Sequence, residues 1–219
     1  MTDNIKILAL RLLDGFDEHI SMQLLCWYDW RIISFLEMGA GERLRGFTGL
    51  HGVAYFGIEE IVTEVLDMRE WDVNAADCTG NTALTWAASR GHDGVVKRLL
   101  ERKGINPNQP DMIGRTPLTW AAQNGHKQVV GMLLEREDVN PDQPDTYSGR
   151  TLISWAAEKG REGIVKMLLE RKDINPDQAD SKYGWTPLSR AAKKGHEVVV
   201  KMLLERKDVN PEQLDTKYG

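Results

Sequence analysis

The sequence predicts an all-α solenoid of stacked helix-turn-helix units with protruding loops. Three observations predict it: a segment that returns at a fixed period, apolar residues three and four apart within each copy, and glycine and proline at the same places in every copy. The clearest copies begin at Gly114, Gly149 and Gly184 and are 35 residues long, and the copy that begins at Gly80 has 34. A fixed period of this length is typical of repeat proteins, in which each unit packs only on its neighbours.

The first helix of the unit at 114–148 is predicted from its ends and its apolar stripe. Thr116 is a suitable N-cap, and Pro117 fits the first turn because the N–H groups there have no partner within the helix. Gly125 ends the helix, since glycine readily takes a positive φ. The apolar stripe, spaced i, i+3 and i+4, consists of Leu118, Ala121 and Ala122.

A second helix follows in the same unit, and an extended turn follows that helix. Asn140-Pro141 ends the second helix, because a residue before proline is disfavoured in helical geometry. The polar residues 142–148 are then expected to form a protruding loop. The apolar face of the second helix consists of Val129, Val130, Leu133 and Leu134.

These residues resemble the ankyrin repeat. The stretch TPLTWAAQNGH, followed by VV and LLE, is similar to the family pattern T-P-L-H-x-A-A-x-x-G-H with its leucine-rich second helix. The resemblance covers residues 46–219 and divides them into repeats at 46–79, 80–113, 114–148, 149–183 and 184–218. Two departures are a longer loop in the last three repeats and the loss of the histidine after T-P-L. Only His51 keeps that histidine, which leaves open the family's usual threonine–histidine hydrogen bond in the repeats with Thr85, Thr119, Ser154 and Ser189.

The two ends of the chain carry separate expectations. Residues 1–45 read as N-terminal helices that form a degenerate capping repeat. DGFDEHIS and FTGLHGVAYFGIEEIV also resemble, more weakly, the stretch that leads into ankyrin arrays of fungal NACHT-type (NLR-like) receptors. The spacing of a phosphate-binding loop recurs at 41–46, but Phe47 stands where the essential lysine is needed. Gly219 is in register with the first residue of each repeat, which predicts an array that is cut at the start of a further repeat or that associates end to end.

Composition excludes several classes of function. The chain has 219 residues, of which 41% are hydrophobic and 28% charged, with a net charge of -5. No stretch approaches the roughly 18 consecutive apolar residues of a membrane span, and the N-terminus has no signal-peptide pattern. Cys26 and Cys78 lie in different units, which favours a reducing compartment, cytoplasmic or also nuclear. The overall acidity disfavours nucleic acid as a partner.

The sequence shows no catalytic, cofactor or metal site. Three histidines share one repeat position, where units about 10 Å apart cannot place them on one metal, and Arg161 holds that position in the fourth repeat. We therefore predict structural histidines at His92, His126 and His196. The asparagine of each D-V-N-like segment is expected to hydrogen-bond within a tight turn, although the resemblance also permits hydroxylation there. These asparagines are Asn74, Asn106, Asn140, Asn175 and Asn210.

A candidate binding face lies opposite the Leu-Ala-Ala stripe of the first helices. In ankyrin arrays this set lines the concave groove, and here it is rich in tryptophan and basic residues. Tryptophan and arginine are enriched in binding hot spots, but the tryptophans could equally fill a packing position between helices. The candidate residues are Phe47, Tyr55, Phe56, Asn81, Trp86, Arg90, Arg115, Trp120, Asn124, Arg150, Trp155, Lys159, Trp185, Arg190 and Lys194.

The sequence therefore predicts a non-catalytic protein–protein interaction module. The basic and aromatic lining of the groove favours a partner with an acidic or aromatic-bearing segment. Two alternatives remain open: the sensor or assembly tail of a larger NLR-like signalling ATPase, and an array that associates with itself. No cofactor is expected.

Overall fold

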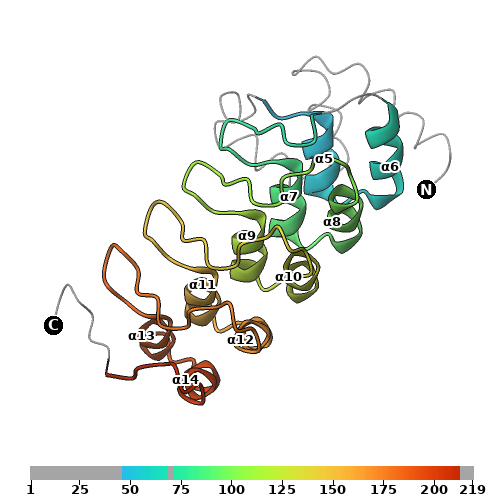
Figure 1. The fold of residues 1–219 in the computed structure, drawn as a ribbon. Helices are drawn as coiled ribbons and strands as arrows, with labels where there is room; N and C mark the ends of the chain where they lie inside the picture. The colour runs from blue at the N-terminus through green and yellow to red at the C-terminus, as the bar shows by residue number, and fades with distance from the viewer. Residues whose placement is uncertain (1–45, 69–71, 213–219) are drawn as a thin grey trace. The chain divides into compact units, whose positions relative to one another are not determined.

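The structure is a computed structural model that describes residues 46–68 and 72–212 (Figure 1). The predicted N-terminal cap at 1–45 lies outside the described residues. The described chain divides into two compact units. The first unit contains the described residues up to Ala87 together with His92–Asn106, and the second contains Ala88–Gly91 and the described residues from Pro107 onward. Because α7 (Ala83–Arg90) contributes to both, each unit is described by itself.

The first unit is built on three helices and the beginning of α7. Helix α5 (Gly49–Phe56) packs on α6 (Glu59–Met68), and α6 packs on α8 (Asp93–Leu100). Apolar side chains of these helices fill the interior of the unit. The fully buried side chains of this unit include Leu50, Val53, Ile61, Val62, Leu84, Val96 and Leu99.

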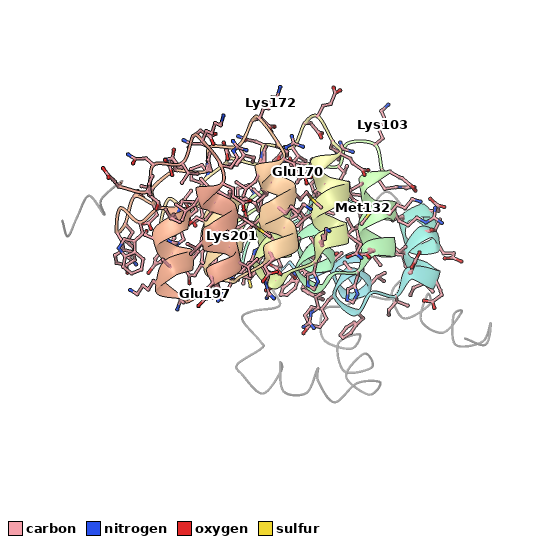
Figure 2. All side chains as sticks on the ribbon, turned by 90° about the horizontal axis from the view of Figure 1, so that it is seen from below. Lys103, Met132, Glu170, Lys172, Glu197 and Lys201 are labelled. Atoms are coloured by element: carbon pink, nitrogen blue, oxygen red, sulfur yellow. The ribbon has the colours of Figure 1, made fainter. Side chains whose placement is uncertain are left out.

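The second unit contains three helix pairs in two layers. Helices α9 (Pro117–Asn124), α11 (Leu152–Glu158) and α13 (Pro187–Lys193) follow one another in what we call the first layer. Helices α10 (Lys127–Leu134), α12 (Glu162–Leu169) and α14 (Glu197–Leu204) form the second layer, each packed on its own partner. Charged side chains cover the solvent side of the second layer, including Glu170, Glu197 and Lys201 (Figure 2). The described residues form ten helices and no strand, so the predicted all-α solenoid of helix pairs is confirmed.

Helix ends follow the predicted chemistry. Thr116 caps α9 by accepting a hydrogen bond from the Thr119 backbone N–H at 3.3 Å, and Pro117 occupies the first turn. Gly125 ends the helix with φ 90°, a conformation that favours glycine because it has no Cβ. In the last three repeats the asparagine after the second helix closes a tight turn, as predicted. Asn140 Oδ1, for example, accepts the Asp142 N–H at 3.0 Å. Asn74 differs from the prediction, because its Oδ1 accepts the Asn106 N–H of the next repeat at 2.8 Å.

Hydroxyl pairs replace the histidine missing from the T-P-L-H pattern in most repeats. Where His51 is present, its Nδ1 lies 2.8 Å from the Thr48 hydroxyl. In the next two repeats a threonine hydroxyl lies 3.1 or 3.2 Å from the capping hydroxyl, and in the last repeat Ser189 Oγ lies at 3.4 Å. The fourth repeat differs, because the buried hydroxyls of Thr151 and Ser154 have no hydrogen-bond partner. The family's hydrogen bond is therefore kept by other donors in three of these four repeats.

The repeated histidines join neighbouring repeats. The Nε2–H groups of His126 and His196 donate to the carbonyls of Ser89 and Glu158 at 3.0 and 2.9 Å. Arg161 does the same in the fourth repeat, where its Nε donates to the Gln123 carbonyl at 3.2 Å. Within the first unit, His92 bonds the Tyr55 carbonyl at 3.1 Å. The shared position therefore requires a donor that reaches the preceding repeat, which arginine provides as well as imidazole.

The cover over the second layer decreases toward α14. Leu134 is 8% exposed, Leu169 is half-buried and Leu204 is 49% exposed, although the three occupy equivalent positions. Val198 is also 48% exposed. Leu168 and Leu203, one residue earlier in the second helices, are fully buried. Helix α14 therefore carries exposed apolar surface, formed by Val198 and Leu204.

Candidate interaction face on the second unit

Each tryptophan of the predicted row donates a hydrogen bond to a buried aspartate that precedes its helix. In the second unit, the indole Nε1 of Trp120 lies 3.0 Å from Asp111 Oδ2, and that of Trp155 lies 3.1 Å from Asp145 Oδ2. Trp86 makes the same contact with Asp77 at 2.8 Å within the first unit. These bonds fix the orientation of the rings. Trp155 is only 7% exposed, so for this residue packing dominates.

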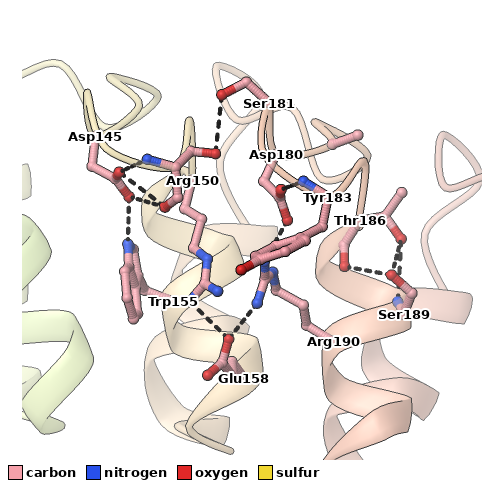
Figure 3. A network of polar contacts seen from close by, with 12 residues as sticks. Asp145, Arg150, Trp155, Glu158, Asp180, Ser181, Tyr183, Thr186, Ser189 and Arg190 are labelled. Carbon is pink, nitrogen blue, oxygen red and sulfur yellow. Dashed lines mark hydrogen bonds and ion pairs between the residues drawn. The ribbon is translucent and has the colours of Figure 1, made fainter. Parts of the chain in front are cut away.

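Arg190 replaces the tryptophan in the last repeat and pairs with the equivalent aspartate, Asp180 (Figure 3). The Arg190 side chain is only 2% exposed. The expectation that Arg190 is an accessible member of the binding face is therefore corrected. Its guanidinium is turned inward because the buried Asp180 carboxylate needs a donor, as Asp145 does beside Trp155.

Arginines from the start of the first-layer helices stack on the tryptophans. The Arg115 guanidinium carbon lies 4.8 Å from the centre of the Trp120 ring and 4.5 Å from that of Trp155. Arg150 lies 4.4 Å from the Trp155 ring centre. These are cation–π distances. The face is therefore a series of alternating guanidinium and indole groups that support one another.

Glu158 joins the two last repeats. Its Oε2 accepts Arg150 Nη1 at 2.9 Å and Arg190 Nη1 at 2.5 Å (Figure 3). Burial lowers the pKa of Arg150 and the charge of Arg190 lowers it further, while Glu158 acts in the opposite direction. Burial would raise the pKa of Asp180, but the Tyr183 N–H at 2.6 Å and Arg190 outweigh it and hold that pKa below its usual value.

A hollow of about 490 Å³ opens beside this cluster, and we call it the α13 pocket. Its lining residues are Arg150, Glu158, Tyr183, Trp185, Arg190, Lys193 and Lys194. The Tyr183 and Trp185 rings lie 5.6 Å apart, and Lys193 Nζ lies 3.6 Å from the Trp185 ring centre. Lys193 and Lys194 are exposed, while Trp185 and Tyr183 are half-buried. The pocket thus offers accessible cations and accessible aromatic rings.

The predicted site residues of the first unit form a packing cluster. The ring centre of Trp86 lies 5.2 Å from that of Tyr55 and 6.3 Å from that of Phe47, and Phe56 is 4.8 Å from Tyr55. Phe47 is 7% exposed, so its prediction as a binding residue is corrected: its ring belongs to the core. Asn81 is half-buried and donates to the Thr79 hydroxyl at 2.7 Å.

The other predicted residues of the second unit are exposed. Asn124 donates to the Ser89 carbonyl at 2.8 Å, and Arg90, Lys159 and Lys194 lie at the solvent. The structure therefore brings Arg150, Trp185, Arg190 and Lys194 to one pocket. It places Arg115, Trp120 and Trp155 in the stacked series, and no described contact joins Arg90, Asn124 or Lys159 to that pocket.

Sequence reasoning missed the aspartates and Tyr183 as parts of this face. A signal for the aspartates was present, because an aspartate precedes the first glycine of the last four repeats at nearly the same distance. The recurring residues of this kind are Asp77, Asp111, Asp145 and Asp180. Among the described residues, no group of three or more histidine, cysteine or acidic side chains is placed to hold a metal ion. Nor is any helix in the described ranges long and apolar enough to cross a membrane.

The comparison with protein families agrees with this architecture. A model of ankyrin repeats in three copies matches residues 19–111, 50–145, 107–180 and 137–215. The chain therefore belongs to the ankyrin-repeat family. Ankyrin repeats generally mediate protein–protein interaction and are typically non-catalytic. A search of curated proteins gave no match. The family match does not extend to the resemblance to NACHT-type receptors, which stays a hypothesis.

Proposed function

We propose that the chain is a non-catalytic module that binds a partner protein through the surface formed by the arginines, tryptophans and lysines of α9, α11 and α13 and the residues just before or after these helices. We call this surface the first-layer face, and its accessible residues are the ones proposed to bind. One observation carries the proposal: the internal contacts of this face recur, while its outward groups change from repeat to repeat. The recurring contact is a buried aspartate with a tryptophan or arginine donor. The changing position before the helix cap holds Arg115, Arg150 and Trp185 in successive repeats.

This division suits a binding surface. A position held for packing has to meet the same neighbours in every repeat, whereas a position that contacts a partner meets different groups along the partner. Recognition through a row of repeats is expected to produce such variation on a constant support. Half-buried aromatic rings beside charged groups are also the usual composition of binding hot spots.

The experiment compares partner capture by three forms of the protein. Wild type, the double variant Trp185→Ala and Lys194→Ala, and the control Lys166→Ala and Lys201→Ala would be used as bait in an extract of the source cells. The control pair lies exposed on the second layer. The proposal expects a protein that wild type and control retain and the double variant loses, with direct binding then shown using purified components. Retention by all three forms would contradict it.

A second candidate function is self-association through α14. The observation that favours it is the exposure of Val198 and Leu204, together with a hollow of about 510 Å³ that Leu204 lines. Light scattering during size-exclusion chromatography tests it, because Leu204→Glu should convert an associated species into a monomer. A wild-type monomer at high concentration would rule it out. The finer proposal, a sensor or assembly tail of a larger NLR-like ATPase in the cytoplasm or nucleus, rests on the sequence resemblance alone.

A further inference from the structure

We infer that the α13 pocket is an anion-binding anchor that receives carboxylate side chains from an acidic segment of the partner protein. The inference rests on the proposed function and goes further, because it names the part of the face that recognises the partner and the chemistry of the group recognised. It is argued from the charge, the donors and the walls of this pocket.

The pocket carries more positive than negative charge. Four cationic side chains and one carboxylate line it. The carboxylate of Glu158 is already shared by Arg150 and Arg190, and Asp180 lies behind Arg190. Lys193 and Lys194 form no ion pair with a described residue. Both lysines are exposed, so their charge is accessible to an anion that enters the pocket.

The pocket already contains one carboxylate, that of Glu158, which shows that the arginine donors of the pocket can bind this group. Glu158 Oε2 takes one Nη1 donor from each of two arginines. The Nε atoms of Arg150 and Arg190 are buried and have no hydrogen-bond partner among the described residues. Guanidinium groups bind carboxylates in a planar, directional way. Burial, and after it the positive charge of Arg190, lower the pKa of Arg150 and so disfavour its charged form. A second anion nearby would stabilise that charge.

The aromatic walls strengthen the attraction. Trp185 and Tyr183 line the pocket with apolar ring surface, and electrostatic attraction is stronger beside such surface than in open water. The flat rings also give the methylene groups of a glutamate side chain an apolar surface. Lys193 already lies over Trp185, so its ammonium group is held at the wall rather than free in solution.

The charge distribution favours an acidic peptide over nucleic acid. The whole chain has a net charge of -5, which repels a long polyanion, whereas a short acidic segment meets only the local field. Nucleic acid binding needs a continuous track of accessible cations. Here the next arginine along the face, Arg115, is stacked on two indole rings, which leaves its guanidinium less available to a phosphate backbone.

The test uses a short fluorescein-labelled oligo-glutamate peptide as the probe, with oligo-glutamine and oligothymidylate as comparison probes. Fluorescence anisotropy is measured for wild type, for the double variant Lys193→Glu and Lys194→Glu, and for the control Lys166→Glu and Lys201→Glu. Both double variants change the net charge equally, and all four lysines are exposed. The inference predicts that the α13 variant loses about tenfold or more in affinity, while the control loses about twofold or less. Oligo-glutamine should not bind, and added salt should weaken the oligo-glutamate complex.

A second measurement locates the probe. The indole N–H signal of Trp185, assigned with Trp185→Phe, should shift in the NMR spectrum when oligo-glutamate is added, whereas that of Trp120 should not. Equal losses in both charge-reversal variants, or no shift at Trp185, would overturn the inference. Tighter binding of oligothymidylate than of oligo-glutamate would replace it with nucleic acid recognition.

The outcomes separate this inference from the proposed function. If oligo-glutamate does not bind but a captured protein still depends on Trp185 and Lys194, the anion anchor is wrong and the protein-binding face stands. If oligo-glutamate binds in the pocket but no captured protein depends on these residues, the pocket is an anion site and the proposed function is wrong.

Discussion

Arg190 pairs with the buried carboxylate of Asp180 at the place where, one repeat earlier, the Trp155 indole donates to Asp145. The aspartate is constant and its donor changes from a neutral indole to a charged guanidinium. This exchange is possible because Trp155 on α11 and Arg190 on α13 occupy equivalent positions, and each side chain reaches the Oδ2 atom of its own aspartate. It also places a buried ion pair between the fourth and the last repeat, next to Glu158.

The first prediction follows from this pair. Arg190→Ala leaves Asp180 buried without its strongest donor, and breaking a buried ion pair in this way costs about 3–5 kcal/mol. Arg190→Trp supplies the indole donor that Asp145 has and should cost clearly less. Urea unfolding of both variants measures the difference. Equal losses would show that restoring a donor to Asp180 recovers no stability, and so that the contact with Asp180 is incidental.

His51 makes the stability of the first unit depend on pH. Its Nδ1 accepts the Thr48 backbone N–H at 3.0 Å, and its Nε2–H faces the carbonyls of Ala75 and Asn81. Burial lowers the pKa of His51, while the charge of Asp77 and the two carbonyls partly oppose it. Because a protonated ring cannot accept from Thr48, the neutral form belongs to the folded state.

The sign of the effect follows from that lowered pKa. Above the unfolded pKa of about 6.5 the contribution of His51 is complete, and it is lost as the pH falls through the lower pKa of the folded state. His51→Thr copies the Thr82–Thr85 pair of the next repeat and has no group that titrates there. Urea midpoints between pH 8 and acidic pH should therefore fall more steeply for wild type than for the variant. Parallel curves would contradict this role of His51.

Core contributions should differ along the second layer. Leu168 is fully buried on α12, so Leu168→Ala should cost about 2–5 kcal/mol through the cavity that it leaves. Leu204 is 49% exposed on α14, so Leu204→Ala should cost about 0.5 kcal/mol or less. Chemical denaturation of the two variants compares them directly. A large loss for Leu204→Ala would mean that something covers the α14 face in solution.

The sequence predicted the helices well because their signals are local. Pro117, Gly125 and the Leu-Ala-Ala stripe lie within a few residues of the helix that they define. The candidate face was predicted less well. Whether Arg190 is accessible depends on Asp180, which reaches it only after the preceding loop has folded back. The α13 pocket likewise combines residues of two repeats, and no local pattern in either repeat shows it.

The central claim is that the accessible residues of the first-layer face bind a partner protein. The most direct measurement is the affinity of the captured partner, by calorimetry, for Trp185→Ala and for Lys201→Ala. Trp185 lines the α13 pocket, whereas Lys201 is exposed on the second layer of the same unit. The account predicts that Trp185→Ala weakens binding by about 1–2 kcal/mol or more, roughly tenfold, while Lys201→Ala leaves it unchanged. Weaker binding by Lys201→Ala together with unchanged binding by Trp185→Ala would place the partner on the second layer and contradict the account.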